Sequence, residues 1–294
     1  MKLAAIDIGS NAARLLIVEV LINEDRHPYP AFNKLNLVRV PLRLGFDVFE
    51  SGTISKDRIG MVMQTMKAYK HLMNAYGVEH LKACATSAMR DAKNAADIIR
   101  KIKLETGIGI EVISGDMEAN LVYENHVAEN MDRDHSYLYI DVGGGSTELS
   151  FFTNGKLTYK KSFNIGTIRL LKNLVKESQW DEMKEALKAV TKNQREVVAI
   201  GSGGNINKIF SMSKRKDGKP LPLELLKDYY KELSNVPLEE RISNYGLRED
   251  RADVIVPALQ IYTNAMRWSD AQEIYVPKIG LVDGLIRHLW DEVK

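Results

Sequence analysis

Two short segments of the chain combine an acidic residue with a glycine turn in the same order. The segments are Ile6-Asp7-Ile8-Gly9-Ser10 and Ile140-Asp141-Val142-Gly143-Gly144, and their aspartates lie 134 residues apart. Glycine has no Cβ atom, so such a turn lets successive backbone N–H groups approach an anion. Two turns of this kind favour phosphate binding over the alternative, a pair of tight hairpins that require positive φ angles. The candidate phosphate-binding residues of the turns are Ser10, Asn11, Gly143, Gly144, Gly145 and Ser146.

Three carboxylates near these turns are candidates for holding a cation. Asp7 and Asp141 stand inside apolar runs, where an ionised carboxylate is costly unless a cation or hydrogen bonds compensate it. Glu148 follows the second turn and could converge on the same ion. Hard oxygen ligands beside a phosphate site suit Mg²⁺. The alternative is that these carboxylates accept hydrogen bonds from the amides of the turns.

Glu118 is the most informative single acid. It belongs to an expected helix that begins at Gly115, and it shares a helical face with Leu121 and Val122. This face is expected to pack against the protein, and desolvation raises a carboxyl pKa toward the range of a general base. The alternative is a half-buried glutamate that pairs with an arginine.

Two further features could bind phosphate or a nucleoside. Arg90 follows an expected strand and could grip a phosphate through two hydrogen bonds, or form a surface salt bridge. Gly201, Gly203 and Gly204 follow another strand and open a helix. This loop lacks the third glycine of the dinucleotide fingerprint, so it is either a nucleoside or phosphate loop or a close strand–helix turn.

The hydrophobic pattern predicts an α/β protein in which a strand–turn–strand unit occurs twice. Pro257 is expected to kink the helix that contains it. The repeat indicates two similar halves, and we place the domains at residues 1–122 and 123–294, with the last helix able to pack back on the first domain. The expected strands are 3–8, 14–22, 35–44, 81–85, 110–113, 137–142, 149–153, 157–163, 196–200 and 272–276, and the expected helices are 55–76, 94–106, 115–129, 167–175, 179–192, 222–234, 237–244, 251–268 and 280–292.

Composition excludes several classes of protein. Lys plus Arg total 41 and Asp plus Glu total 39, so the net charge of +2 argues against a dedicated nucleic-acid binder. The single cysteine, Cys84, excludes an internal disulfide framework and is expected to be inert core. No apolar run reaches the roughly 18 residues of a membrane helix. We therefore expect a cytoplasmic protein that does not engage a membrane.

These motifs resemble those of the exopolyphosphatase / guanosine pentaphosphate phosphohydrolase family, within the actin–hexokinase–sugar kinase superfamily. The resemblance spans nearly the whole chain in order. It implies two ribonuclease-H-like (actin-like ATPase) domains with an interdomain cleft that holds the phosphates. The matching stretches are residues 6–11, 85–92, 112–119, 140–149, 201–204 and 251–253, together with Gly166, Arg169-Leu170, Gly280-Leu281 and Gly284-Leu285.

The resemblance also implies roles for individual residues. Glu118 would activate water, and Asp141 and Glu148 would lie toward the metal. The residues implied to hold phosphate are Ser10, Asn11, Arg14, Arg90 and Gly143 to Ser146. The chain departs from the family pattern at Ala12, where serine is frequent, at Met117, where a second glutamate is frequent, at Asn205, where threonine is common, and at Leu259, where glycine is common.

The resemblance implies a Mg²⁺-dependent hydrolase that releases terminal orthophosphate from polyphosphate, and also from guanosine pentaphosphate, by in-line attack of water. Two alternatives remain open at this point. One is an ATP-dependent kinase relative that acts on a small molecule, and the other is a non-catalytic regulator that binds an alarmone or nucleotide. The oligomeric state is also open, and a homodimer is one possibility.

Overall fold

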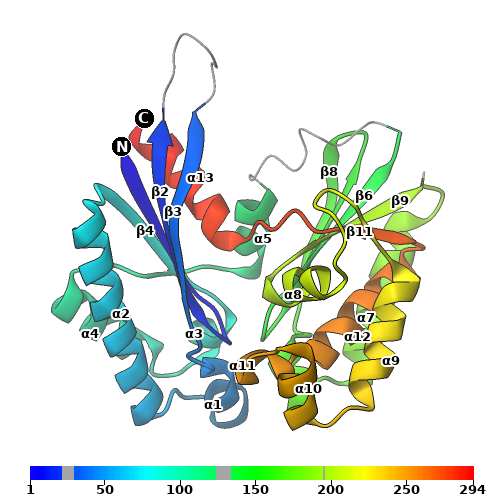
Figure 1. Cartoon of the computed structure of the whole chain (residues 1–294), viewed down its shortest axis with the longest axis horizontal. Helices are drawn as coiled ribbons and strands as arrows, with labels where there is room; N and C mark the ends of the chain where they lie inside the picture. Colours follow the sequence, from blue (N-terminus) through cyan, green and yellow to red (C-terminus); the bar gives the residue numbers. More distant parts are fainter. Residues whose placement is uncertain (22–29, 124–133, 195) are drawn as a thin grey trace. The chain divides into compact units, whose positions relative to one another are not determined.

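The computed structural model describes residues 1–21, 30–123, 134–194 and 196–294 (Figure 1). The chain divides into two compact units, which we call unit 1 (residues 1–125 and 281–294) and unit 2 (residues 126–280). Each unit contains one β-sheet with helices packed on it and its own hydrophobic core. The mixed α/β class expected from the sequence is therefore confirmed.

Unit 1 contains a five-stranded sheet in the order β3-β2-β1-β4-β5. The strands β1, β2 and β3 form an antiparallel meander, whereas β4 and β5 continue parallel to β1. From Leu3 to Ile8 the buried strand β1 is apolar on both faces except at Asp7. The strands are β1 (Lys2–Ile8), β2 (Ala13–Leu21), β3 (Ala31–Val40), β4 (His80–Ala85) and β5 (Glu111–Val112).

Local signals set the ends of the main helix of unit 1. The hydroxyl of Ser55 accepts a hydrogen bond from the Arg58 N–H (3.4 Å) at the start of α2, and Gly77 ends it with a left-handed φ of 66°. The helices are α1 (Leu44–Ser51), α2 (Lys56–Tyr76), α3 (Ser87–Asp91), α4 (Ala95–Thr106), α5 (Gly115–Tyr123) and α13 (Leu281–Val293). The part of the expected helix 115–129 beyond Tyr123 lies outside the described residues.

The expected third strand, residues 35–44, was wrong at both of its ends. It begins at Ala31 and ends at Val40, and α1 starts at Leu44. Arg43 has a left-handed conformation (φ 53°), which ends the extended run. Leu44 and Val48 are then buried four residues apart on α1, which is helical spacing, an arrangement that the apolar pattern alone did not separate from a strand.

Unit 2 contains a six-stranded sheet in the order β10-β11-β9-β6-β7-β8. Its strands β6, β7 and β8 form an antiparallel meander and β9 runs parallel to β6, so the order repeats that of unit 1. Asn154 and Gly155 connect β7 to β8 with φ angles of 54° and 73°, as an Asn-Gly hairpin requires. The strands are β6 (Ser136–Val142), β7 (Thr147–Thr153), β8 (Lys156–Phe163), β9 (Val197–Ser202), β10 (Leu221–Pro222) and β11 (Glu273–Tyr275).

The helix expected over residues 251–268 is two helices. The helical conformation is interrupted at Asp253 and Val254. Pro257 lies in the first turn of the second helix, where a backbone N–H has no intrahelical acceptor, so the missing N–H of proline costs no hydrogen bond. Pro257 therefore does not kink a continuous helix. The helices are α6 (Thr167–Leu171), α7 (Glu177–Thr191), α8 (Gly204–Met212), α9 (Leu223–Ser234), α10 (Leu238–Tyr245), α11 (Glu249–Ala252) and α12 (Ile255–Trp268).

None of the helices in the described part of the chain combines the length and the apolar character that a membrane span requires.

Candidate active site

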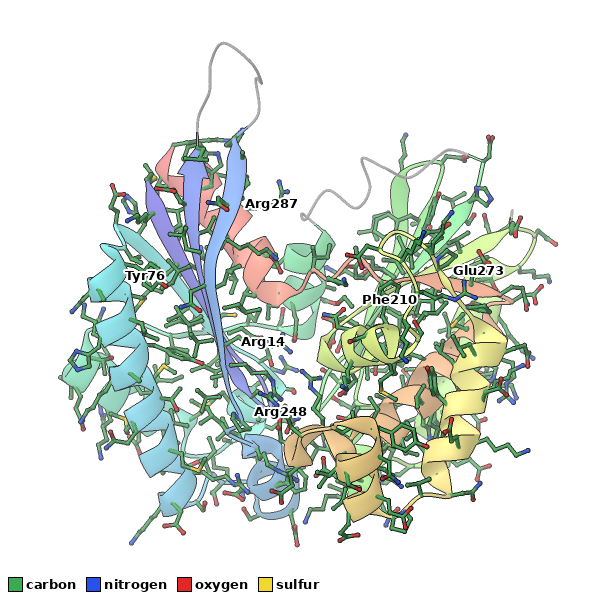
Figure 2. All side chains as sticks on the ribbon, in the orientation of Figure 1. Arg14, Tyr76, Phe210, Arg248, Glu273 and Arg287 are labelled. Atoms are coloured by element: carbon green, nitrogen blue, oxygen red, sulfur yellow. The ribbon has the colours of Figure 1, made fainter. Side chains whose placement is uncertain are left out.

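The central strand of unit 1 carries a buried ion pair at its end. Asp7 is 4% exposed, and its partners in register are Arg14 on β2 and Cys84 on β4. Side chains at such paired positions point to the same face of a sheet. Arg14 (Figure 2) places Nη1 3.4 Å from Asp7 Oδ2. The buried carboxylate of Asp7 is thus compensated by a guanidinium.

The buried thiol of Cys84 is close enough to two predicted site carboxylates to be affected by their charges. The thiol is 1% exposed, as the sequence predicts for an inert core cysteine. Burial raises its pKa well above the ordinary range, and the charges of Asp7 and Glu118 raise it further. Asp7 and Glu118 therefore lie within electrostatic reach of one buried side chain.

The turn after β1 is held against the start of α1. Gly9 N–H donates to Ala12 O (3.0 Å), and the carbonyls of residues 10 and 11 accept hydrogen bonds from the α1 segment. The C=O and N–H groups of a trans peptide point in opposite directions, so the N–H groups that follow these carbonyls point away from α1. The two bonds run from Gly45 N–H to Ser10 O and from Arg43 N–H to Asn11 O, each at 2.9 Å.

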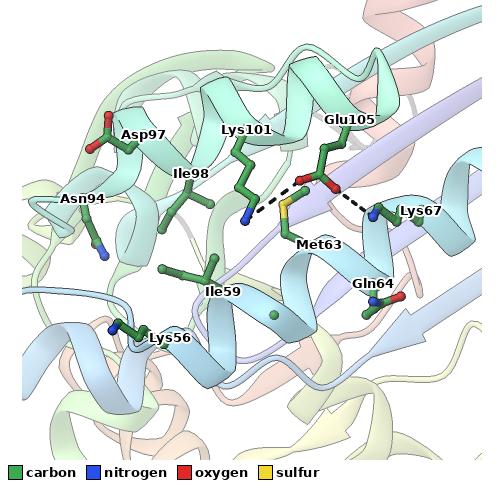
Figure 3. Close-up of a pocket in the computed structure, with 11 residues that line it drawn as sticks. Lys56, Ile59, Met63, Gln64, Lys67, Asn94, Asp97, Ile98, Lys101 and Glu105 are labelled. Atoms are coloured by element: carbon green, nitrogen blue, oxygen red, sulfur yellow. Dashed lines mark ion pairs between the residues drawn. The ribbon is translucent and has the colours of Figure 1, made fainter.

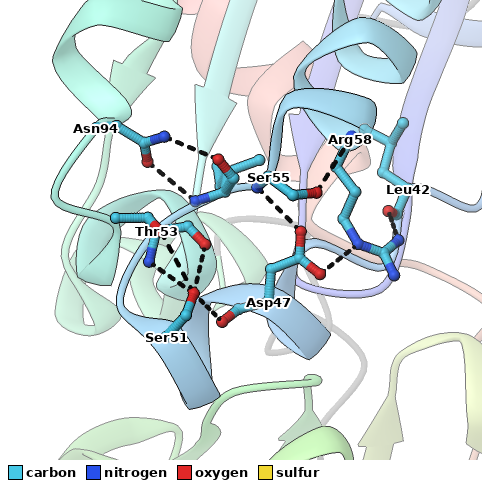
Figure 4. A network of polar contacts seen from close by, with 8 residues as sticks. Leu42, Asp47, Ser51, Thr53, Ser55, Arg58 and Asn94 are labelled. Carbon is cyan, nitrogen blue, oxygen red and sulfur yellow. Dashed lines mark hydrogen bonds and ion pairs between the residues drawn. The ribbon is translucent and has the colours of Figure 1, made fainter.

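A polar network holds α1 on the first turn of α2 (Figure 4). Arg58 donates to Asp47 Oδ1 through Nε (2.7 Å) and to Leu42 O through Nη1 (2.7 Å), while Ser55 N–H donates to Asp47 Oδ2 (3.0 Å). Burial acts to raise the pKa of Asp47, but the hydrogen bonds from Ser55 and Arg58 outweigh it and the pKa is lowered. This network fixes residues 43–45, which in turn orient the turn after β1.

Glu118 is half-buried near the start of α5. Ser114 closes this helix terminus, because its hydroxyl accepts the Met117 N–H (3.1 Å) and its carbonyl accepts the Glu118 N–H (2.9 Å). The last helix, α13, packs on α5, and a Cβ atom at Gly284 would lie 1.8 Å from Leu121 O. Only glycine permits this approach, so α13 fixes the helix that carries Glu118.

Arg90 and Ser10 are joined to the same end of the unit 1 sheet. Arg90, on α3, donates from Nη1 to Ile113 O (2.8 Å), just before α5. The hydroxyls of Ser10 and Ser87 form a buried hydrogen bond of 2.7 Å, which links the turn after β1 to α3. Unit 1 therefore gathers every site residue predicted in it: Asp7, Ser10, Asn11, Arg14, Arg90 and Glu118.

A pair of carboxylates occupies the corresponding strand end in unit 2. Asp141 on β6 pairs in register with Glu148 on β7 and with Ser202 on β9. Glu148 is 3% exposed, and its Oε1 accepts a hydrogen bond from Ser162 on β8 (2.8 Å). Four polar side chains thus form a row across one face of the sheet, in the order Ser202, Asp141, Glu148, Ser162. Within the described ranges, no three His, Cys, Asp or Glu side chains form a metal-binding group.

The glycine turn after β6 is held in place by hydrogen bonds that its backbone carbonyls accept. Gly143 N–H donates to Ser146 O (2.9 Å), which repeats the closing bond of the turn after β1. The carbonyls of residues 143–145 all accept hydrogen bonds from residues 167–169 at the start of α6. These bonds run from Thr167 N–H to Gly143 O (3.0 Å), from Ile168 N–H to Gly144 O (2.9 Å) and from Arg169 Nε–H to Gly145 O (2.8 Å).

This arrangement directs three successive amides to one side. Because the carbonyls of 143–145 face α6, the N–H groups of residues 144–146 face away from it. Within the described part of the chain, no backbone or side-chain group accepts a hydrogen bond from these three amides. A row of unpaired backbone N–H groups of this kind is able to bind an anion. A Cβ atom at Gly166 would lie 2.4 Å from the carbonyl carbon of Gly145, so glycine is required there for the turn to approach α6.

Neither closing glycine has the positive φ that the hairpin alternative requires. Gly9 and Gly143 lie outside the left-handed region, but a Cβ atom on either would press on the carbonyl that closes its turn, at 3.3 and 3.1 Å. Their role is close approach rather than a left-handed turn.

The three glycines of the 201–204 loop each have a packing reason. A Cβ atom at Gly201 would lie 2.8 Å from Ile274 Cδ1, and one at Gly204 would lie 2.4 Å from the Arg251 guanidinium. Gly203 has a φ of 106° and would bring a Cβ atom within 3.1 Å of Asp141 Oδ1. These contacts account for a close strand–helix turn, and the nucleoside or phosphate role predicted for the loop stays a prediction.

A pocket of about 620 Å³ lies between α2 and α4 (Figure 3). Ile59, Met63 and Ile98 form its apolar floor, and Glu105 pairs with Lys67 (2.7 Å) at its rim. No predicted site residue lines this pocket, so it does not belong to the strand-end sites.

Sequence reasoning missed several residues that shape these sites. Arg169 and Gly166 were matched to the family pattern without a role, and Ser202 stood in a glycine motif in which only the glycines were weighed. Ser162 and the Asp47–Arg58 pair carried no sequence signal, because strand register and helix contacts join residues far apart in the chain.

The sequence matches the model of the Ppx/GppA phosphatase family over residues 25–292. Exopolyphosphatase 1 of Mycobacterium tuberculosis is 24% identical over 309 aligned positions, covering 97% of this chain and 87% of that protein. A bifunctional 3-dehydroquinate synthase/phosphatase of Fusobacterium nucleatum is 35% identical over 57% of this chain. The chain matches only 25% of that longer protein.

Solved structures resemble the chain over its whole length. The Aquifex aeolicus member of the Ppx/GppA family is 28% identical, with a TM-score of 0.76 and coverage of 100% of this chain and 99% of that one. An exopolyphosphatase from Cytophaga hutchinsonii is 26% identical, with a TM-score of 0.85 and the same coverage. The two-domain actin-like ATPase fold expected from the sequence is thereby confirmed.

Proposed function

We propose, from the premise that the chain belongs to the Ppx/GppA phosphatase family, that it hydrolyses inorganic polyphosphate and releases terminal orthophosphate. The mycobacterial relative named exopolyphosphatase aligns over nearly the whole chain, which supports this substrate. The observation that carries the proposal is the set of three unpaired amides at residues 144–146, beside the carboxylate pair of Asp141 and Glu148. Amides of this kind suit phosphate oxygens, and the carboxylates suit the cation that accompanies them.

Phosphate oxygens would be held by backbone and cationic groups. The N–H groups of residues 144–146 and of the turn after β1 supply donors without side-chain entropy. Arg90 has one guanidinium nitrogen committed to Ile113 O, which holds the rest of its planar group in a fixed orientation. Arg14 shares its charge with Asp7, so its phosphate role depends on the nitrogens outside that ion pair.

The residues of unit 2 fit a divalent cation. Asp141 and Glu148 are like-charged neighbours on one sheet face, an arrangement that is unfavourable unless a cation neutralises it. Mg²⁺ commonly takes one or two carboxylates and completes its shell with water and phosphate oxygens, so two carboxylates suffice. When bound, it would neutralise charge on the phosphates. Asp7 was also predicted as a ligand, but its carboxylate has Arg14 as a partner.

Glu118 is the proposed general base. A half-buried carboxylate near a helix start, fixed by Ser114 and by the packing of α13 on α5, can accept a proton from water at Oε1 or Oε2. The water oxygen would attack the terminal phosphorus in line, and the bridging oxygen of the shortened chain would leave. Because Met117 stands where a second glutamate is frequent in the family, the assignment rests on Glu118 alone.

Three finer points belong to this proposal. They are action on guanosine pentaphosphate, a cytoplasmic location, and assembly as a homodimer. Guanosine pentaphosphate has a nucleoside and polyphosphate has none. The 201–204 loop is the proposed place where the protein would bind that nucleoside.

A phosphate-release assay tests the proposed function. Long polyphosphate, short polyphosphate, guanosine pentaphosphate and ATP are compared with Mg²⁺ and with a chelator. We expect Mg²⁺-dependent release from polyphosphate without an added acceptor. Transfer from ATP to an added acceptor, with no release from polyphosphate, would instead identify a kinase. Tight binding of guanosine pentaphosphate without turnover of any substrate would identify a regulator.

A further inference from the structure

Ser202 has a buried hydroxyl that the fold leaves unsatisfied. The residue ends β9 and is 1% exposed, and its Oγ has no hydrogen-bond partner within the residues that the structure describes. Its carbonyl, in contrast, accepts a hydrogen bond from the buried Tyr262 hydroxyl (2.5 Å), which holds the backbone of Ser202 in place. Leaving a buried hydroxyl without a hydrogen-bond partner is destabilising. A buried polar group that stays unpaired in a native protein therefore needs an explanation, such as a bound ion.

The neighbours of Ser202 indicate that reason. Ser202 pairs in register with Asp141, so the two side chains share a face of the sheet, and Glu148 is next in the same row. A Cβ atom on Gly203 would lie 3.1 Å from Asp141 Oδ1, which means that this carboxylate oxygen turns toward the end of β9. The hydroxyl without a hydrogen-bond partner therefore lies next to Asp141, at the end of the carboxylate pair away from Ser162.

The other end of the row behaves differently. Ser162 donates its hydroxyl to Glu148 Oε1 at 2.8 Å and so orients that carboxylate. Ser162 is thus used within the protein, whereas Ser202 keeps its oxygen available beside Asp141, with Glu148 one strand further along the row. A lone pair there would complete a set of one neutral and two anionic hard oxygens, the ligand type that Mg²⁺ prefers.

We propose that Ser202 Oγ is a third protein oxygen for the divalent cation assigned to Asp141 and Glu148. This inference rests on the cation site of the proposed function. The hydroxyl keeps its proton and contributes a lone pair, as the serine or threonine of phosphate-binding loops does toward Mg²⁺. It adds a ligand without adding a third negative charge to a pair that already repels.

Ser202→Ala tests the assignment, and Ser136→Ala is its matched control. Ser136 lies at the other end of β6, is fully buried, and also has an Oγ without a partner in the described residues. Binding of Mn²⁺ is measured by calorimetry in the absence of substrate, together with the melting temperature of the metal-free protein. We expect Ser202→Ala to weaken Mn²⁺ binding about tenfold or more, because the loss of a direct ligand should cost at least as much as the loss of an outer-shell partner. The metal-free melting temperature should hold or rise, because an unsatisfied group is removed.

Ser202→Cys adds a second measurement, the preference between Mn²⁺ and Cd²⁺, which would not change if Ser202 had only a structural role. Unit 1 carries Cys84 at the matching position of its own sheet, so this strand position accepts a thiol. A sulfur ligand favours soft cations. We expect Ser202→Cys to lose affinity for Mn²⁺ and to gain affinity for Cd²⁺ relative to the wild type, which already contains Cys84.

Three results would overturn the assignment. Mn²⁺ affinity of Ser202→Ala within twofold of wild type would remove Ser202 from the site while leaving the proposed hydrolysis intact. An equal loss in Ser136→Ala would show a general loosening of the sheet. Unchanged Mn²⁺ binding in Asp141→Asn would show that the cation site itself is misplaced, which separates failure of the proposed function from failure of the Ser202 assignment.

Discussion

The two sheets carry matching positions with opposite charge patterns. At the end of the central strand each has an aspartate, Asp7 in unit 1 and Asp141 in unit 2, and each aspartate pairs with a residue seven positions later on the next strand. In unit 1 that residue is Arg14, which forms an ion pair, and in unit 2 it is Glu148, which repeats the negative charge.

This difference shows how one architecture can serve two kinds of chemistry. In unit 1 the aspartate has a guanidinium partner on the neighbouring strand. The carboxylate pair of unit 2 places like charges on neighbouring strands, an arrangement that a bound cation would relieve. We infer that unit 1 contributes the proton acceptor Glu118 and cationic side chains, whereas unit 2 contributes the cation site.

The largest effect should come from Glu118→Gln in unit 1. Glutamine keeps the size of the side chain but does not accept a proton at neutral pH, so we expect kcat for phosphate release to fall about 10²–10⁴-fold. The Mg²⁺ concentration that gives half-maximal activity and the melting temperature should stay unchanged. Activity within a few-fold of wild type would remove Glu118 as the base, and a collapsed melting temperature would make it a structural residue.

Asp141→Asn should produce the reverse pattern in unit 2. Loss of an anionic ligand should weaken Mg²⁺ binding by about tenfold or more, and high Mg²⁺ should recover part of the activity. The metal-free protein should melt at the same or a higher temperature, because a like-charge pair is removed. A Mg²⁺ titration that matches the wild type would contradict the assignment of Asp141.

Arg14→Met tests the claim that Arg14 compensates the buried charge of Asp7 in unit 1. It leaves the carboxylate of Asp7 buried without its guanidinium, and removal of one partner of a buried pair is destabilising. We expect a loss of about 1–3 kcal/mol in the free energy of unfolding, measured with urea at pH 7. The double variant Arg14→Met/Asp7→Asn should recover part of that loss. If Arg14→Met melts like the wild type, Asp7 depends on other partners.

The residue pattern alone was sufficient to predict those structural features that depend on residues close together in the sequence. The apolar run of β1 with one acid, the capped helix α2 and the Asn154-Gly155 hairpin are each encoded within a few residues, and all are found as predicted. The repeat of aspartate and glycine turn also identified the two strand ends, because both halves carry the same short pattern.

The parts that were missed depend on contacts between distant residues. Ser202 is significant only because β9 pairs with β6 in a register that places it beside Asp141, 61 positions earlier in the chain. Similarly, Arg169 orients the glycine turn from 24 residues away. The segment around Leu44 was ambiguous for another reason: a short buried run has the same composition in a strand or a helix, and the left-handed Arg43 decided between them.

The smallest expected effect concerns how the two glycine turns are supported. The turn of unit 2 is fixed directly by α6, whereas the turn of unit 1 is fixed by α1, which Asp47 holds through Arg58 and Ser55. Since the pKa of Asp47 is lowered in the folded state, its stabilisation is present above the unfolded pKa of about 4 and is lost as the pH falls through the lower folded value.

Asp47→Asn should therefore reduce the free energy of unfolding at pH 7 by about 1 kcal/mol or less, and the gap to wild type should narrow below about pH 4. Urea unfolding at pH 7 and pH 3.5 measures both values. Asp97→Asn is the matched control, because Asp97 pairs with Arg100 on an exposed helix face and should change neither value. A gap for Asp47→Asn that stays constant with pH would show that its carboxylate charge does not hold α1. The turn of unit 1 would then depend on α1 through backbone bonds alone, as the turn of unit 2 depends mainly on α6.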